Sequence, residues 1–148
     1  MTAFTIDEIT AGAVVRLDTA RLRTLGGSET NAQVTPTEDR AVTGTHDFLV
    51  VEVAGERAVA VPLFPRSSPG SAPLEPEKRR GEAGGWREEP VHYSRWQHWR
   101  IPLAALVAAS ADDPGSPSDR RGYAVGDVDT LRGLLNWASR NRCAFRAV

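Results

Sequence analysis

The sequence has little of several residue types, and each shortage excludes a class of protein. Cys143 is the only cysteine among 148 residues, so no internal disulfide can form and we expect a protein of the reducing cytoplasm. No apolar run approaches the ~18–20 residues of a membrane span. The first ten residues, MTAFTIDEIT, carry acids and no basic stretch before an apolar core, so we expect neither a secretory signal nor a membrane partner.

Lysine is almost absent, since Lys78 is the only lysine and the other basic residues are arginines. Arginine suits bidentate phosphate recognition, although the codon bias of a GC-rich genome is the simpler explanation. The formal net charge of −1 gives no overall attraction to nucleic acid, so any binding depends on a local patch. The pairs Arg79–Arg80 and Arg120–Arg121 are candidate patches, but such pairs are commonly solvated surface.

Motifs for metals and cofactors are missing as well. His46, His92 and His98 have no cysteine or carboxylate at ligand spacing, except for Asp47 beside the first of them. The chain has no phosphate-binding loop, dinucleotide fingerprint or nucleophile elbow. We therefore expect no metal and no cofactor.

Short β-forming runs are what the sequence does contain. Its length predicts one domain, residues 1–148, beginning with a strand near Val14–Asp18. The runs Phe48–Val53 and Ala58–Leu63 flank a turn at Ala54–Arg57 and predict an antiparallel hairpin. Both runs are almost continuously apolar, which implies either burial on both faces or closure into a barrel.

Two stretches have no regular period. Thr19–Thr45 is interpreted either as a long loop or as a loop with a weak strand near Asn31–Val34. Pro65–Pro90 is a long insertion rich in proline and glycine, and such loops are usually either functional or disordered. Trp86 within it favours order, because an exposed indole gains by covering a surface.

The last third returns to regular structure. Val91–Ile101 is rich in aromatic and β-forming residues and predicts one strand. A short helix is expected over Leu103–Ala109, after Pro102, and a loop over Asp112–Gly122. Residues 127–141 carry an apolar stripe at helical spacing and predict a C-terminal helix. The fold class is therefore mainly β with a C-terminal helix.

Polar residues at the open end of the hairpin are the first candidate site. His46 precedes the first strand, and Arg66 and Ser67 follow the second. RNA can be cleaved without a metal by a base that removes the 2′-hydroxyl proton, an acid for the leaving oxygen and a cation for the phosphate charge. In this hypothesis His46 transfers the proton, Arg66 contacts the phosphate and Ser67 is a supporting donor. Alternatively, these are ordinary strand-end and loop residues.

A second candidate is the aromatic and basic run around Trp96. Arg95, Trp96 and His98 combine a stacking ring with basic groups, a pattern typical of single-stranded RNA contacts. Strict alternation would place Trp96 and His98 on one strand face and Trp99 on the other, in the core.

The order of these parts resembles the MazF/PemK growth-inhibitor toxins. The resemblance rests on GAVVRLD, a variable polar loop, HDFLVVEV and RAVAVPLF, followed by a long loop, a later strand and a terminal helix. It implies a small SH3-like barrel, here with a long irregular insertion at residues 65–90. It also implies a homodimeric, metal-independent endoribonuclease that acts on single-stranded RNA and is neutralised by an antitoxin protein.

This chain departs from the family at the catalytic positions. Where the family usually has an Arg-Pro pair at the opening of the second strand, this sequence has His46-Asp47. Where the family has a hydroxyl residue shortly after Pro-Leu, Pro62-Leu63 is followed by Phe64-Pro65. Either His46 replaces the arginine as base, or the fold has kept a binding groove for nucleic acid or protein and lost cleavage.

Overall fold

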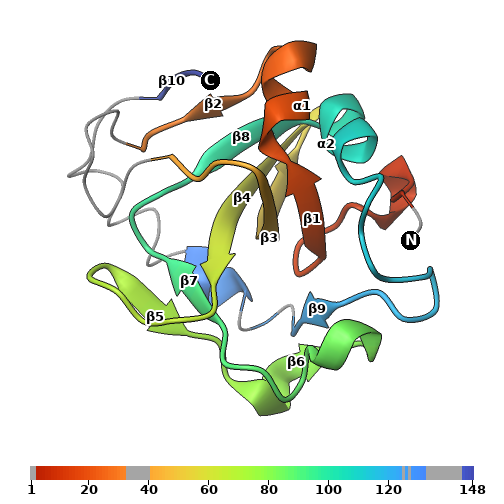
Figure 1. Ribbon diagram of the computed structural model, residues 1–148, viewed down its shortest axis with the longest axis vertical. Helices are drawn as coiled ribbons and strands as arrows, with labels where there is room; N and C mark the ends of the chain where they lie inside the picture. Colours follow the sequence, from red (N-terminus) through yellow and green to blue (C-terminus); the bar gives the residue numbers. More distant parts are fainter. Residues whose placement is uncertain (1–2, 33–40, 125, 127, 133–144) are drawn as a thin grey trace.

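A central antiparallel sheet organises the molecule (Figure 1). The computed structural model describes residues 3–32, 41–124, 126, 128–132 and 145–148. The strand order of the main sheet is β1-β3-β4-β8-β2-β10, and every pairing in it is antiparallel. These strands are β1 Val14–Asp18, β2 Glu29–Thr30, β3 Thr45–Ala54, β4 Arg57–Phe64, β8 Trp99–Pro102 and β10 Arg146–Ala147.

The predicted hairpin is confirmed as β3 and β4, which pair from Ala54–Arg57 to Phe48–Pro62. Gly55 begins the two-residue turn with φ 61°, a conformation that only glycine adopts without strain. The register shifts between Val50 and Glu52, so one extra residue bends β3. The predicted first strand is confirmed as β1, which pairs with β3 and places Arg16 opposite Asp47.

The long strand β4 changes partner along its length. Its first part, Arg57–Ala60, pairs with β8, and its last residues, Leu63 and Phe64, pair with β7. Pro62 lies between these two parts. Because proline has no N–H for a ladder, its position suits the point at which the strand passes from one neighbour to the other.

The single strand expected over Val91–Ile101 is wrong, because the structure breaks it into two. These are β7, His92–Ser94, and β8, which begins at Trp99. Between them the Ser94 hydroxyl accepts hydrogen bonds from the backbone N–H groups of Trp96 (3.2 Å) and Gln97 (2.8 Å). This local side-chain bonding competes with the ladder and turns the chain, so the strict alternation expected for Trp96 and His98 does not apply.

Two short helices cover one face of the sheet (Figure 1). The helix predicted near residue 103 is confirmed as α2, Leu103–Ala109, whereas α1, Thr19–Leu25, lies in the stretch expected to be a loop. Asp18 caps α1 by accepting the N–H groups of Ala20 and Arg21. The core on this face consists of apolar residues from the sheet, both helices and the N-terminal segment, among them Leu17, Leu22, Phe48, Trp99, Ile101 and Leu106.

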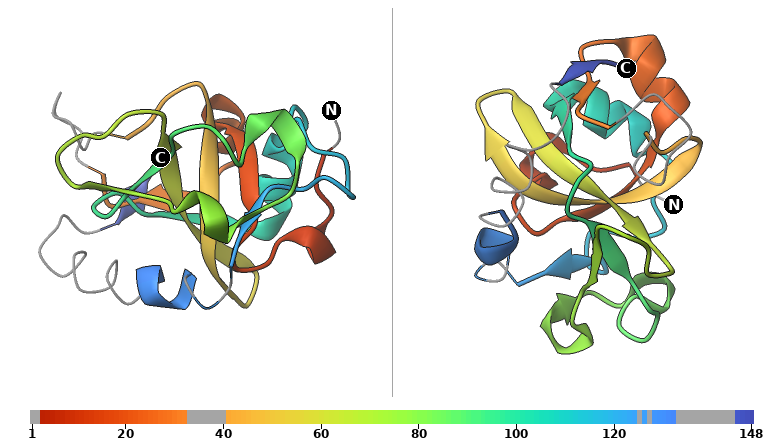
Figure 2. Two further views of the ribbon diagram at one scale, coloured as in Figure 1. Left: turned by 90° about the horizontal axis from the view of Figure 1, so that it is seen from below. Right: turned by 90° about the vertical axis from the view of Figure 1, so that its left-hand side faces the viewer.

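The insertion covers the opposite face (Figure 2, right). All of residues 65–90 belong to the described part, and they form β5 Ser71–Pro73, the 3-10 turn η2 Pro76–Lys78, β6 Arg79–Arg80 and the 3-10 turn η3 Ala83–Gly85. Strand β5 pairs with β7, and β6 pairs with β9, Gly122–Tyr123. Trp86 is buried in this second core with Leu49, Val51, Val61, Leu63, Leu74, Tyr93, Tyr123 and Val128.

The buried Arg79 fastens the insertion to itself. This arginine is 4% exposed, and its guanidinium donates to the carbonyl oxygens of Trp86 (2.8 Å), Leu74 (2.7 Å) and Glu89. Trp86 in turn donates from Nε1 to the Gly122 carbonyl at 3.1 Å. Arg121 is also only 6% exposed. In each of the pairs Arg79–Arg80 and Arg120–Arg121, one of the two arginines is therefore buried and cannot belong to a basic surface patch.

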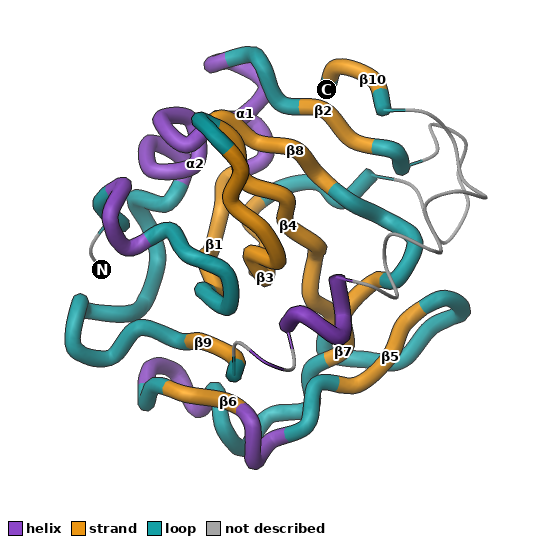
Figure 3. The backbone as a smooth tube through the Cα atoms, turned by 180° about the vertical axis from the view of Figure 1, so that it is seen from behind, coloured by secondary structure: helices purple, strands orange, loops and turns teal. Residues whose placement is uncertain are grey.

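Burial on both faces, one of the two alternatives for the apolar strands, is what the structure has. Neighbouring residues of β3 point to opposite cores, Phe48 and Val50 to the first and Leu49 and Val51 to the second. The outermost described strands, β1 and β10, do not pair with each other, so the sheet is open and is not the closed barrel that was expected (Figure 3).

The remaining segments are short. A 3-10 turn, η1 Ile6–Glu8, begins the described chain. Of the expected C-terminal helix at 127–141, Val128–Arg132 are helical, and residues 127 and 133–141 lie outside the described residues. Within the described ranges no helix is long and apolar enough to cross a membrane.

Candidate functional site

His46 lies at the open end of the hairpin, as expected, but its ring is enclosed by aromatic side chains. Its ring centroid is 5.9 Å from that of Phe48 and 5.2 Å from that of Phe64, both edge-on. The Nε2 atom is buried and has no hydrogen-bond partner. Burial lowers the pKa of His46, and a backbone hydrogen bond at Leu63 and the charge of Asp47 oppose this only in part. His46 is therefore neutral at pH 7.

Arg66 and Ser67 are exposed on the loop that leaves β4. Neither side chain makes a hydrogen bond or ion pair with His46 or with any other described residue. The structure thus brings His46 against Phe64, two residues before Arg66, without joining the three expected catalytic residues in one hydrogen-bonded group.

The expected RNA-contact residues lie in the turn between β7 and β8. Arg95 is exposed, and its backbone N–H donates to the Gly70 carbonyl at 2.9 Å. Trp96 packs closely on Gly70, where an added Cβ would lie 2.4 Å from the indole ring. Of this pair, Arg95 offers the more accessible group.

His98 belongs to the interior. It is 4% exposed, its backbone N–H donates to Oδ1 of Asn31 at 2.7 Å, and its carbonyl accepts the Thr30 hydroxyl at 2.7 Å. Burial lowers the pKa of His98 to about 4. The ring therefore has almost no surface to offer a ligand.

A cavity of about 330 Å³ opens beside the end of the hairpin. Apolar residues of β4, of the insertion and of the loop after α2 form most of its wall, and four charged residues complete it. These lining residues are Arg16, Asp47, Leu63, Phe64, Pro65, Gly84, Trp86, Glu89, Pro90, Val91, Pro114 and Arg121.

Asp47 is the centre of an ion-pair network on the cavity wall. Its Oδ1 accepts from Nε of Arg16 at 3.1 Å, and its two oxygens accept from Arg121 at 3.0 and 3.1 Å. Burial by itself would raise the pKa of Asp47, but the hydrogen bonds and charges of Arg121 and Arg16 outweigh it and lower the pKa. The carboxylate is therefore ionised and paired with the two arginines.

Asp113 supports the same network from behind. Its side chain is 1% exposed, and it accepts the backbone N–H groups of Arg16 at 2.8 Å and Gly115 at 2.9 Å. Arg121 Nη2 lies 3.4 Å from its Oδ2. The loop after α2 is thereby fixed to β1, and it holds Arg121 against Asp47.

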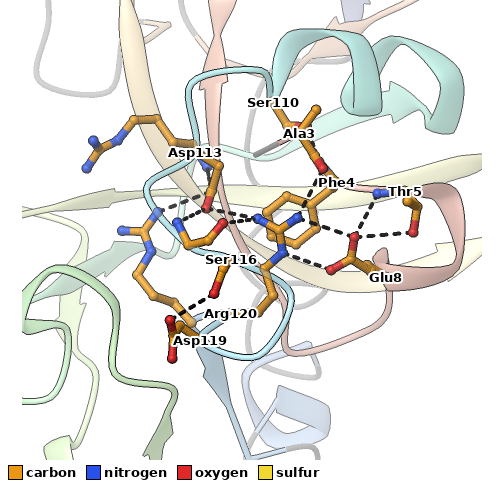
Figure 4. Close-up of polar contacts among 12 residues, drawn as sticks. Ala3, Phe4, Thr5, Glu8, Ser110, Asp113, Ser116, Asp119 and Arg120 are labelled. Atoms are coloured by element: carbon orange, nitrogen blue, oxygen red, sulfur yellow. Dashed lines mark hydrogen bonds and ion pairs between the residues drawn. The ribbon is translucent and has the colours of Figure 1, made fainter. Parts of the chain in front are cut away.

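A further arginine fastens the N-terminal segment to this loop (Figure 4). Arg120 donates from Nε to Glu8 at 2.8 Å and from Nη2 to the Ala3 carbonyl at 3.0 Å, while its guanidinium lies 3.8 Å from the ring centroid of Phe4. The hydrogen bond from Arg120, only partly opposed by burial, lowers the pKa of Glu8 to about 2. This group is a structural support behind the cavity.

Arg16 is a cation on the cavity wall with accessible free donors, whereas the unpartnered Nε of Arg121 is buried. Arg16 uses Nε for Asp47, is 37% exposed, and its two terminal nitrogens have no partner among the described residues. A guanidinium with free N–H groups beside a partly apolar cavity can bind a phosphate or carboxylate.

Sequence reasoning missed Arg16 and Asp113 as site residues, and it considered Arg121 only as part of a basic surface patch. One signal was available, a charged residue at position 16 within the apolar run of GAVVRLD. No signal in the sequence pairs Asp47 with Arg121, which lies 74 positions away.

Comparison with known proteins adds no identification. No family model matches the sequence, and neither a curated protein nor a solved structure matches the chain. The fold and site thus define a mainly β, antiparallel protein with an arginine-bearing cavity, and the likeness to the MazF/PemK toxins stays a prediction. Within the described ranges no group of three or more His, Cys, Asp or Glu residues is arranged to hold a metal ion.

Proposed function

We propose that this chain is a toxin-like protein that binds single-stranded RNA at the cavity and cleaves it without a metal. The observation that carries the proposal is Arg16, which has two free terminal nitrogens on a cavity lined by Phe64, Pro65 and Pro90. Cationic donors beside apolar, partly aromatic walls suit a phosphodiester and its bases. The cavity also lies at Asp47, where the resemblance implies the catalytic centre.

The wider family expectations belong to the same proposal. The antiparallel strands β1, β3 and β4, which are neighbours in the sheet, support an SH3-like ancestry, with the barrel opened where β4 turns to β7. The working unit would be a homodimer, and an antitoxin protein would compete with RNA for the cavity. Sedimentation of the purified chain tests the dimer directly, since a monomer would contradict it.

Cleavage would use the groups next to the cavity. Neutral His46 takes the proton of the 2′-hydroxyl, the 2′ oxygen attacks phosphorus, and the bond to the 5′ oxygen breaks. The protonated His46 then gives this proton to the leaving 5′ oxygen. The products are a cyclic phosphate and a 5′-hydroxyl. Arg16 and Arg66 offset the phosphate charge, with Ser67 as a supporting donor. Because Nε2 of His46 is buried, RNA binding must first uncover this atom.

A cleavage assay with labelled single-stranded RNA in EDTA tests this activity. The wild-type chain should cut the RNA, and His46→Ala should lower the rate by at least about a hundredfold, the lower range for losing a general base. His92→Ala is the matched control, since His92 lies in β7 and has no role in the proposed cleavage, although neither histidine lines the cavity itself. A His46→Ala rate equal to that of the wild type would show that His46 is not the base.

The buried Nε2 of His46 favours one alternative, a non-catalytic binding module for nucleic acid or protein. In that case the RNA stays intact, and expression of the chain does not arrest growth. If induced expression arrests growth and His46→Ala relieves the arrest, the hypothesis of a non-catalytic binding module is excluded.

A further inference from the structure

We infer that the cavity is a subsite for one guanine nucleotide of the bound RNA. This inference rests on the proposed function and names the base that the same site selects. Two charged side chains with unused hydrogen-bonding groups, Arg16 and Glu89, line the cavity together with apolar residues.

The size and wall of the cavity limit what enters it. A volume of about 330 Å³ is at the lower end of the ~300–1,000 Å³ range of small-molecule sites, so it has room for one nucleotide and not for several. Phe64, Pro65, Pro90 and Pro114 supply flat or rigid apolar surfaces from three different segments. Such surfaces cover the face of a base without selecting among bases.

Glu89 is the residue on the cavity wall that can discriminate among the RNA bases. Its carboxylate makes no hydrogen bond or ion pair with any described residue, whereas the Asp47 carboxylate is occupied by Arg16 and Arg121. The backbone of Glu89 is held, because its N–H donates to Gly85 at 3.2 Å and its carbonyl accepts from the buried Arg79. The cavity thus has at its edge an exposed carboxylate, unpaired among the described residues, on an anchored segment.

Hydrogen-bond chemistry then favours guanine. A carboxylate is an acceptor with two oxygens, and guanine presents two adjacent donors, N1–H and the 2-amino group, on its Watson–Crick edge. Adenine and cytosine place an acceptor nitrogen next to their amino group, and uracil flanks its N–H with two carbonyls, so each of these would repel one carboxylate oxygen. Arg16 at the same cavity supplies donors for the phosphate of that nucleotide.

Titration with mononucleotides tests the subsite by isothermal calorimetry on the full chain. Guanosine monophosphate should bind at least about tenfold more tightly than inosine monophosphate, which lacks only the 2-amino group; tenfold corresponds to ~1.4 kcal/mol. Glu89→Gln should remove this preference, and Glu88→Gln, an exposed neighbour that does not line the cavity, should keep it. Arg16→Gln should weaken both nucleotides equally.

The outcomes separate this inference from the proposed function. Equal binding of the two nucleotides, or an unchanged preference in Glu89→Gln and Glu89→Ala, overturns the guanine subsite. If single-stranded RNA binds at Arg16 without a guanine preference, the proposed function stands and the subsite falls. If the guanine nucleotide binds with the expected preference but RNA does not bind, the cavity is a site for a free guanine nucleotide, and the proposed RNA-binding function falls.

Discussion

Asp113 supports the cavity network, and Asp113→Asn should destabilise the fold more than any exposed acid in its loop. The side chain is 1% exposed and accepts backbone N–H groups from Arg16 and Gly115. Asn keeps one acceptor oxygen, so the variant loses one of these charge-assisted hydrogen bonds, about 1.5 kcal/mol or more, and leaves the other backbone donor unsatisfied at a further ~1–3 kcal/mol. Breaking a buried ion pair costs a similar ~3–5 kcal/mol, and the Asn amide would also turn a donor toward the Arg121 guanidinium.

The expected loss is therefore about 3 kcal/mol in the free energy of unfolding, or roughly 6–12 °C in Tm for a chain of this size. Urea unfolding followed by tryptophan fluorescence measures it. Asp112→Asn is the matched control, because Asp112 is the exposed neighbour and should change stability by less than ~0.5 kcal/mol. A loss below about 1 kcal/mol in Asp113→Asn would refute the structural role of this carboxylate.

Two further predictions concern the interior. Trp86→Ala should lower the free energy of unfolding by about 3–5 kcal/mol, because Trp86 is 3% exposed in the second core. Ile6→Ala is the control and should change it little, because Ile6 is 54% exposed. Equal losses in the two variants on urea unfolding would contradict the packed insertion. The unfolded chain protonates His98 near its ordinary pKa of 6.5, but the folded chain does so only near 4. Stability should therefore fall as the pH drops from 7 to 5, by about 2 kcal/mol, and His98→Asn should reduce that fall; an unchanged pH dependence in the variant would show that His98 is not its cause.

Several elements could be predicted because local pattern and tertiary structure agree in them. The β3–β4 hairpin has apolar runs on both sides of a glycine turn, and α2 follows a proline with an Ala/Leu-rich run. Helix α1 was missed although its signals are present, an N-cap at Asp18 and a stop at Gly26, because seven residues with only Leu22 and Leu25 as large apolar side chains are too few to show a helical period. The break at Ser94 could not be foreseen, since the hydroxyl competes with a ladder that the residue types favour.

The site was less predictable than the fold, because long-range ion pairs assemble it. Sequence reasoning placed the site at the open end of the hairpin, and a cavity does lie there beside Asp47. The partners of Asp47 are Arg16 in β1 and Arg121, which directly precedes β9. Their meeting depends on sheet register and on the buried Asp113, neither of which leaves a pattern of spacing in the sequence.

Fluorescence anisotropy with a labelled single-stranded RNA, at fixed salt, tests the central proposal most directly. We expect the wild-type chain to bind the RNA and Arg16→Gln to weaken binding by about tenfold, because the variant loses one charge-assisted contact of ~1.5 kcal/mol. Arg23→Gln, at an exposed position of α1 away from the cavity, should bind as the wild type does. Absence of RNA binding by the wild type, or equal affinity in Arg16→Gln, would contradict the assignment of the cavity as an RNA site.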